Sequence, residues 1–187
     1  MQHRGSCITY VFRRTPGARR FEPWTVVAPS AIMGRLGKNG LGLYAARSFH
    51  RDEYVGRYPT HDVVGHFQTR AEALSAPETR ALLMRGRDKL IALRLGGRGF
   101  TLVDGEGGGP PHVELCNDPR NTALKPNADL TDAGWLRVLH ARVPPFDLAK
   151  TIDENASSEL RVAYGDDFWA LHDVLGTTRE YPHVVAD

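Results

Sequence analysis

The chain has 187 residues, of which 41% are hydrophobic and 25% are charged, a composition typical of a folded globular protein and not of a disordered tail. This length favours one domain, with room for an insertion. No apolar run approaches the ~20 residues that a membrane-spanning helix needs, and no apolar block follows the first Met, so membrane and secreted proteins are not expected. The two cysteines, Cys7 and Cys116, are too few for a disulfide framework or a four-thiolate zinc site.

The net charge of +2 conceals a basic N-terminal segment. Residues 1–20 hold five arginines and no acidic residue, whereas the rest of the chain is mildly acidic. Such a segment is typical of an arm that contacts nucleic acid or an acidic partner, and also of an organellar presequence. Residues 8–12 have the composition of a strand, so we favour a terminal strand with solvated charges, within an arm of residues 1–23. We expect an intracellular protein of the nucleus or the cytoplasm, with organellar targeting as an open alternative.

The first part of the chain predicts short strands and a glycine-rich loop. Residues 24–27, 43–45 and 54–58 have the β-branched and aromatic content of strands. Residues 34–42 separate the first two and hold four glycines, which indicates a loop. Pro59 is expected to end the third strand, because proline lacks the N–H group that a sheet needs.

Two short helices are predicted within residues 59–88. Thr69 followed by Glu72, and Ser75 followed by Glu78, both fit the capping box, in which side chains satisfy the first amides of a helix. Pro77 would stand at an early helical position, where its missing N–H costs nothing. The pattern therefore predicts two helices joined by a kink.

The second half predicts further strands and a final helix. Four segments have strand composition: residues 90–95, 100–103, 135–140 and 160–164. The first two flank a glycine-rich turn and predict a hairpin. Asp166 or Asp167 is expected to cap a terminal helix. The long helices between strands that a parallel sheet needs are missing, so the predicted class is α+β, mostly β.

Several common site patterns are absent. Gly40-Leu41-Gly42 fails as a dinucleotide fingerprint, because the third glycine is missing and no helix is predicted to begin there. His61 and His66 are five residues apart, which is not a metal-binding spacing on a helix, so no metal site is expected. No serine lies in a nucleophile elbow and no phosphate-loop ending is present, so hydrolase and nucleotide-phosphate chemistry have little support.

Taken together, several segments resemble a SET domain, the fold of S-adenosylmethionine-dependent protein-lysine methyltransferases. Residues 40–47, which read GLGLYAAR, match the opening Gly-x-Gly motif of that family, and residues 159–165, ELRVAYG, match its closing Glu-Leu-x-x-x-Tyr-Gly. Asn117-Asp118 stands where the family has Asn-His, and residues 126–128 stand where it has Pro-Asn-Ala.

The resemblance covers residues 24–175 and implies a β-clip-like fold of several small sheets. Residues 59–88 would be the family's variable helical insert. The zinc-binding cysteine clusters that flank many members are absent on both sides, so the helix and tail of residues 166–187 would close the lysine channel instead.

The resemblance also implies roles for single residues. Tyr164 would be the catalytic residue, its hydroxyl orienting the substrate amine at the floor of the channel. The residues that would bind S-adenosyl-L-methionine are Gly40, Leu41, Gly42, Asn117, Asp118, Tyr164 and Trp169. Tyr58 and Val162 would bind the substrate. The Trp169 ring fits adenine stacking and core packing equally well, and Glu159 is expected to be a structural partner of buried backbone or of an arginine.

Three functions follow as hypotheses. The first is a protein-lysine N-methyltransferase that acts on a histone tail or another lysine-containing basic protein, whose positive charge suits the acidic body of residues 21–187. The second is a SET-like, non-catalytic module that binds peptide or chromatin, favoured by Asp118 in place of the family's His. The third is nucleic-acid binding through residues 1–20. None of the three involves zinc or a membrane.

Overall fold

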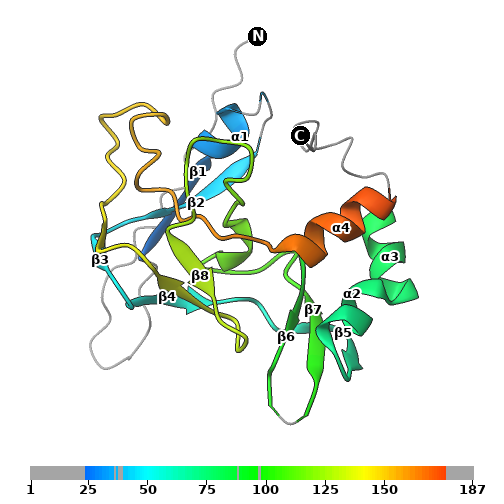
Figure 1. The fold of residues 1–187 in the computed structure, drawn as a ribbon. Coiled ribbons are helices and arrows are strands. Elements are labelled where there is room, and N and C mark those ends of the chain that lie inside the picture. Colours follow the sequence, from blue (N-terminus) through cyan, green and yellow to red (C-terminus); the bar gives the residue numbers. More distant parts are fainter. Residues whose placement is uncertain (1–23, 36, 38–39, 88, 97, 176–187) are drawn as a thin grey trace.

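The structure, a computed structural model, describes residues 24–35, 37, 40–87, 89–96 and 98–175. Within these residues the strands form four small antiparallel sheets, accompanied by a few short helices (Figure 1). The expected α+β, mostly β class is therefore confirmed. No helix in this part of the chain has both the length and the apolar character that crossing a membrane requires. The basic arm of residues 1–23 and the tail of residues 176–187 lie outside the described residues.

The sheets have two or three strands each. β1 (Thr25–Pro29) pairs with β2 (Leu41–Ala45), and β3 (Phe49–His50) pairs with β10 (Arg142–Val143). The third sheet has the order β4 (Tyr54–Arg57), β9 (Trp135–Val138), β8 (Ala128–Leu130), and the fourth has the order β5 (Asp62–Phe67), β7 (Phe100–Asp104), β6 (Leu90–Leu93). The helices are α1 (Ala31–Arg35), α2 (Arg70–Ser75), α3 (Pro77–Met84), the 3₁₀ turn η1 (Val113–Leu115) and α4 (Asp166–Leu175).

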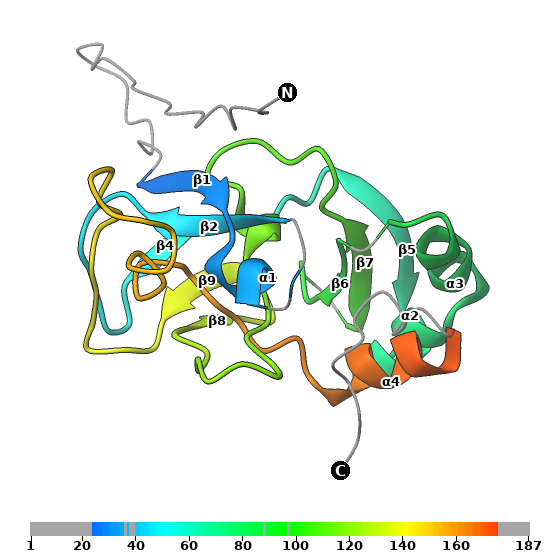
Figure 2. The ribbon, with the colours of Figure 1, turned by 90° about the horizontal axis from the view of Figure 1, so that it is seen from above.

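These elements lie in two groups. Figures 1 and 2 show β1, β2, β4, β8 and β9 on one side of the molecule, and β5, β6 and β7 with α2, α3 and α4 on the other. The β6–β7 hairpin joins the groups, because its residues alternate between two apolar clusters. Leu93 and Val103 belong to the cluster around β2, β4 and β9, whereas Ala92 and Leu102 belong to the cluster under the helices. Successive side chains of a strand point to opposite faces, so this sheet is buried on both.

Most predicted strands are present, whereas six short elements were not predicted: α1, β3, β5, η1, β8 and β10. The segments predicted at residues 24–27, 43–45, 54–58 and 135–140 correspond to β1, β2, β4 and β9, and the predicted hairpin is β6–β7. The strand predicted at residues 160–164 is wrong: this segment makes one isolated bridge, at Arg161, and a second isolated bridge lies just before it, at Glu159. The helical stretch of residues 59–88 also contains an edge strand, β5, and α1 extends into the first two residues of the loop predicted at residues 34–42.

Of the two predicted capping boxes, the first is present in its Thr69 half, while the Glu72 carboxylate accepts from the Gln68 amide at 2.9 Å and not from that of Thr69. The Thr69 hydroxyl accepts a hydrogen bond from the Glu72 amide at 3.1 Å and caps α2. The second box is wrong, because the cap of α3 is Ala76, and the Ser75 hydroxyl donates instead to the Glu72 carbonyl at 3.3 Å. A hydroxyl inside the last turn of α2 is one residue too early to reach the first amides of α3.

The different contacts of the Thr69 and Ser75 hydroxyls can be tested by removing each hydroxyl in turn. Thr69→Ala should lower the free energy of unfolding by about 1 kcal/mol, because an orphan amide of α2 loses its acceptor. Ser75→Ala should change it by less than about 0.5 kcal/mol, as for exposed residues without a special role. Urea denaturation of both variants measures the two values, and an equal loss in both would contradict the assignment of the cap.

The terminal helix begins at Asp166, which is one residue earlier than a cap at Asp166 would require and two residues earlier than a cap at Asp167 would require. α4 includes both acids in its first turn, and Gly165, with a φ of +88°, precedes it. The two carboxylates therefore do not cap the helix as predicted, although negative charge in the first turn still stabilises a helix through its dipole. α4 packs against α2, and its Leu171 enters the apolar cluster under the helices (Figure 2).

Candidate active site

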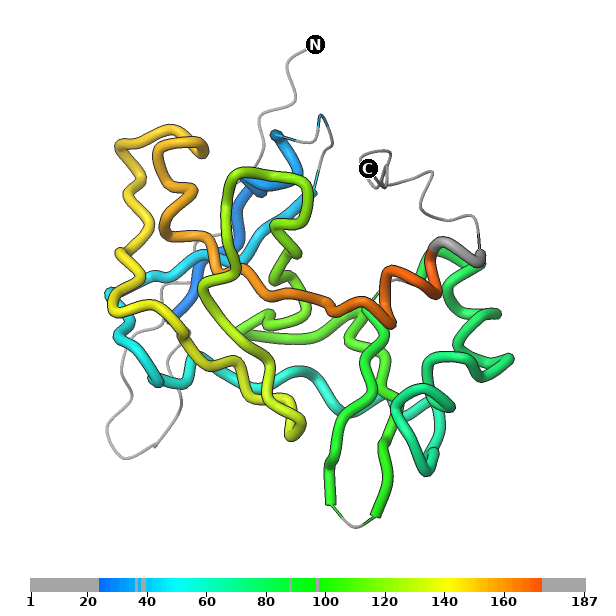
Figure 3. The backbone as a smooth tube through the Cα atoms, viewed as in Figure 1, coloured from blue at the N-terminus to red at the C-terminus, as the bar shows by residue number. Residues whose placement is uncertain are grey.

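Two distant segments cross beside β2 and are bound to each other by hydrogen bonds. The Val162 amide donates to the Asn117 carbonyl at 3.1 Å, and Asn117 forms a parallel bridge with Arg161. On the other side, the Leu160 amide donates to the Leu43 carbonyl of β2 at 2.7 Å. Figure 3 shows the orange segment that leads to α4 passing the yellow-green backbone that follows η1. The segment before α4 therefore lies between β2 and the residues around Asn117.

The Asn127 side chain secures this crossing. Its Nδ2 donates to the Glu159 carbonyl at 2.8 Å, and its Oδ1 accepts from the Arg161 amide at 2.8 Å. Asn127 is 1% exposed, so both halves of its amide are satisfied by backbone that would otherwise be buried without partners. The closing motif and the Pro-Asn-Ala segment are thus brought together in the fold. Their order along the chain does not by itself predict this contact.

Glu159 is a fully buried carboxylate that holds the start of α1. It accepts hydrogen bonds from the Ser30 hydroxyl at 2.6 Å and from the amides of Ala31 and Ile32 at 2.9 and 3.3 Å. These are the amides that a helix start leaves without partners inside the helix. The partners of Glu159 thus include buried backbone, as the structural role predicted for it requires, together with the hydroxyls of Ser30 and Tyr44.

The two motif glycines are required by contacts within the protein. A Cβ on Gly42 would lie 2.4 Å from Oε1 of Glu159, and one on Gly40 would lie 2.8 Å from Cγ of Met33. The Asn117 side chain completes this corner: its Nδ2 donates to the Leu41 carbonyl at 2.8 Å. Four of the predicted cofactor residues therefore lie together, and contacts within the protein account for the identities of the two glycines and of Asn117.

Tyr164 is half-buried and held at both ends. Its hydroxyl donates to the Cys116 carbonyl at 2.8 Å, and its backbone amide donates to Oδ2 of Asp118 at 2.9 Å. Its ring stacks on Trp169, with centroids 6.0 Å apart and an interplanar angle of 19°, and meets the Phe168 ring edge-on. The phenol therefore points into the protein and not out to solvent.

Asp118 explains the departure from Asn-His. Besides the Tyr164 amide, its carboxylate accepts from Nε1 of Trp169 at 3.0 Å and from the Arg120 amide at 2.8 Å. A neutral imidazole has one acceptor nitrogen and could not take three N–H donors. The acid at this position therefore holds the Trp169 ring and the Tyr164 backbone. Trp169 is 6% exposed and packs within the protein.

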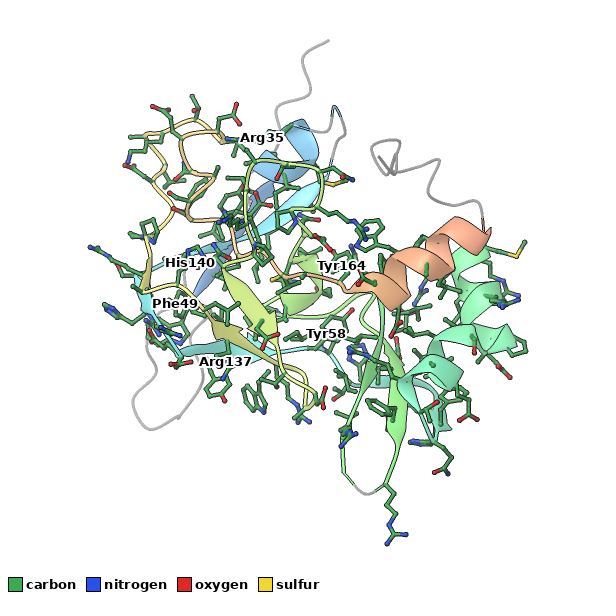
Figure 4. All side chains as sticks on the ribbon, in the orientation of Figure 1. Arg35, Phe49, Tyr58, Arg137, His140 and Tyr164 are labelled. Atoms are coloured by element: carbon green, nitrogen blue, oxygen red, sulfur yellow. The ribbon has the colours of Figure 1, made fainter. Side chains whose placement is uncertain are left out.

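A pocket of about 230 Å³ opens beside Tyr164. We call it the tyrosine pocket; its wall includes Tyr58, Lys89, Glu114, Cys116, Leu130, Leu136, Val162, Tyr164 and Asp166. The structure thus places Tyr58, Val162 and Tyr164, predicted as substrate and catalytic residues, in one wall. Tyr58 is oriented by its hydroxyl, which donates to the Lys89 carbonyl at 2.7 Å. Figure 4 shows Tyr58 and Tyr164 near the junction of the two groups of elements.

A second, more open pocket shares part of this wall. We call it the tryptophan pocket, about 390 Å³, lined by Asp118, Arg120, Lys125, Pro126, Ala163, Gly165, Asp166 and Trp169 among others. Ala163, Gly165 and Asp166 line both pockets. Gly40 and Leu41 line a third pocket with residues of α1. The predicted cofactor residues are therefore not brought into a single cavity, and the segment just before α4 lies between the first two.

Cys116 and Glu114 also line the tyrosine pocket, and sequence patterns did not single them out as site residues. Both residues lie in the mainly apolar segment of residues 113–116. The one sequence signal that could have marked this site is Glu114 itself, an acidic residue between apolar neighbours. Burial raises the pKa of the Cys116 thiol far above its ordinary value, and the nearby charges of Glu159 and Glu114 raise it further. The thiol therefore stays protonated in the folded protein.

This environment should make Cys116 unreactive. In a Cys7→Ser variant at pH 8, iodoacetamide should leave the folded protein unmodified and alkylate Cys116 fully once urea unfolds the chain, because the thiolate is the nucleophile. Folding raises the pKa of the Cys116 thiol, so below pH 9.0, the ordinary pKa of a thiol, its ionisation does not reduce the free energy of unfolding. Above pH 9.0 the thiol ionises more readily in the unfolded chain, so the free energy of unfolding falls as the pH rises. Mass spectrometry measures the alkylation; rapid reaction of the folded protein would contradict the assigned burial.

Comparison with known proteins adds no relative: no protein-family model matches the chain, and no curated protein matches it. Among the described residues, no group of three or more His, Cys, Asp or Glu side chains could hold a metal ion. The chemistry of the site must therefore be inferred from its geometry.

Proposed function

We propose that this protein is an S-adenosyl-L-methionine-dependent protein-lysine N-methyltransferase with a SET-domain fold. The main support is the crossing of the two segments, which sets the Tyr164 phenol in the wall of the tyrosine pocket, 2.8 Å from the Cys116 carbonyl. Further support comes from the order of the motifs along the chain. The proposed substrate is a histone tail or another basic protein, and the proposed compartment is the nucleus or the cytoplasm.

The tryptophan pocket has chemistry suited to the cofactor. It combines the Trp169 ring with the cationic side chains of Arg120 and Lys125 and the carboxylate of Asp118. The carboxylate and the cationic groups of S-adenosyl-L-methionine are the features that the charged residues match. The Trp169 ring lies under the Arg120 guanidinium, whose carbon is 5.4 Å from the ring centroid, and so positions that cation in the pocket. When bound, the cofactor supplies an electrophilic methyl group.

Tyr164 would orient the acceptor amine. Because its hydroxyl donates to the Cys116 carbonyl, the lone pairs of the phenol oxygen are available to accept an N–H of the amine. That contact directs the nitrogen lone pair away from the phenol, which is the alignment an in-line displacement needs. The apolar wall, including Val162, Leu130 and Leu136, excludes water and favours the neutral amine over the charged one.

The non-catalytic module no longer has a specific observation in its favour, because the contacts of Asp118 account for the missing His. Calorimetric titration with S-adenosyl-L-methionine, followed by transfer of a labelled methyl group to recombinant histones, tests the proposal. We expect saturable cofactor binding and label on the histones. Lack of binding at millimolar cofactor would overturn the enzyme and leave the peptide-binding module.

A matched pair of variants locates the cofactor. Lys125→Met removes a cation from the tryptophan pocket, and Lys150→Met removes one from an exposed loop outside it. We expect the first to weaken cofactor binding about tenfold, in the range of one charge-assisted hydrogen bond, and the second to leave it unchanged. Equal affinities in the two variants would remove the tryptophan pocket from the proposal.

A further inference from the structure

Three consecutive residues hold the segment that carries Tyr164. The Cys116 carbonyl accepts the Tyr164 hydroxyl at 2.8 Å. The Asn117 carbonyl accepts the Val162 amide at 3.1 Å. The third contact is made by a side chain: Oδ2 of Asp118 accepts the Tyr164 amide at 2.9 Å. Of these three contacts, the one made by Asp118 is therefore the one that a side-chain substitution removes.

The Asp118 carboxylate also fixes the ring on which Tyr164 stacks. The same Oδ2 accepts Nε1 of Trp169 at 3.0 Å, and the planes of the Trp169 and Tyr164 rings differ by 19°. Oδ1 of Asp118 accepts the Arg120 amide at 2.8 Å. A carboxylate offers about four acceptor sites, so contacts within the protein use most of those on Asp118. This side chain is therefore engaged mainly in holding its neighbours.

These contacts join the two pockets of the candidate site. Asp118 lines the tryptophan pocket, whereas Tyr164 lines the tyrosine pocket. The carboxylate fixes the backbone of Tyr164 and, through Trp169, one face of its ring, while the hydroxyl is fixed separately. Such support matters for a reaction that depends on alignment, because a displacement of about 1 Å can lower a rate about 100-fold.

We propose that Asp118 is a positioning residue for Tyr164: its carboxylate holds the tyrosine backbone and the stacked Trp169 ring, and so keeps the phenol where it orients the acceptor amine. This rests on the proposed function, because it takes Tyr164 as the residue that acts on the amine. It gives Asp118 a role beyond the cofactor binding expected from the sequence, and a role that is exerted through Tyr164.

Kinetics of graded variants test this role. Asp118→Ala removes the acceptor of all three N–H groups, whereas Asp118→Asn keeps one oxygen for Tyr164 and Trp169. At saturating cofactor and histone, we expect Asp118→Ala to lower kcat about 10- to 100-fold and Asp118→Asn to recover most of that loss. In the Tyr164→Phe background, Asp118→Ala should cost less than about twofold more, because residues that act as a unit are not additive. The matched control, Asp62→Asn on the exposed edge of β5, should leave kcat unchanged.

A spectroscopic signal reports the phenol without any methyl transfer. With an isotopic carbon label at Cζ of tyrosine, the NMR signal of Tyr164 is assigned by its absence in Tyr164→Phe, and it senses the hydrogen bond of the hydroxyl. We expect Asp118→Ala to shift or broaden this signal. Asp118→Asn and Asp62→Asn should leave it in place.

Each outcome decides the inference. Full kcat in Asp118→Ala overturns it, and so does a loss confined to the affinity for cofactor, which would make Asp118 a cofactor ligand alone. Should Asp118→Ala not fold, Asp118→Glu decides, because it moves the carboxylate by one methylene group: a shifted Tyr164 signal with a lowered kcat supports the inference, and no change overturns it. A wild type that methylates no histone would refute the proposed function; the Tyr164 signal in Asp118→Ala then supports positioning if it moves and overturns it if it does not.

Discussion

Tyr164→Phe is expected to lower the rate of methyl transfer by about 100-fold or more, the size of effect seen when a positioned hydrogen-bonding group is removed from an active site. The change deletes one oxygen atom, which in the structure donates to the Cys116 carbonyl and, in the proposed mechanism, accepts from the substrate amine. Cofactor binding should persist, because the ring still stacks on Trp169. Transfer of labelled methyl to histones, at saturating cofactor, measures the loss.

The matched control is Tyr54→Phe. Tyr54 is 53% exposed on β4 and is not part of the tyrosine pocket, so the same chemical change there should leave the rate unchanged. Tyr164→Phe should also lose no more than about 1.5 kcal/mol of unfolding free energy, since one hydrogen bond is removed. Full activity in Tyr164→Phe would show that the phenol is structural and would return Tyr164 to its ordinary role as a half-buried tyrosine.

The largest effect on stability is expected from Glu159→Ala, which should cost about 3–5 kcal/mol of unfolding free energy, as when one member of a buried charged network is removed. Glu159 is fully buried, and its carboxylate accepts from the Ser30 hydroxyl and from two amides of α1. The Ser30 hydroxyl and the Ile32 amide would then lose the acceptor that Glu159 provides, and the Ala31 amide would keep only the Tyr44 hydroxyl, at 3.0 Å. Urea denaturation, followed by tryptophan fluorescence, measures the change.

Glu78→Ala serves as the comparison. Glu78 is exposed in the first turn of α3, so its removal should cost less than about 1 kcal/mol. A companion variant, Gly42→Ala, should also destabilise the protein, because its Cβ would lie 2.4 Å from Oε1 of the same carboxylate. A small loss in Glu159→Ala would mean that solvent reaches the donors, contrary to their burial.

Sequence patterns predicted the elements that are stabilised by contacts between residues close together in the chain. The cap at Thr69 and the β6–β7 hairpin depend on residues a few positions apart, so they could be predicted from the chain alone. β5 was missed because its pairing partner, β7, is more than thirty residues away in the sequence, and an edge strand carries a weak pattern. Residues 160–164 have strand composition but lie between β2 and a loop, where only single bridges form.

The amino-acid sequence by itself determined the α+β, mostly β class, the order of the motifs and the candidate residues Tyr164 and Asn117. Only the tertiary structure decided what Asp118 and Glu159 contact, because the partners of each lie far along the chain. Asp118 meets the Tyr164 amide across 46 residues, and Glu159 meets the Ala31 amide across 128. A carboxylate has no local preference strong enough to reveal such contacts; its role follows from which donors the fold brings to it.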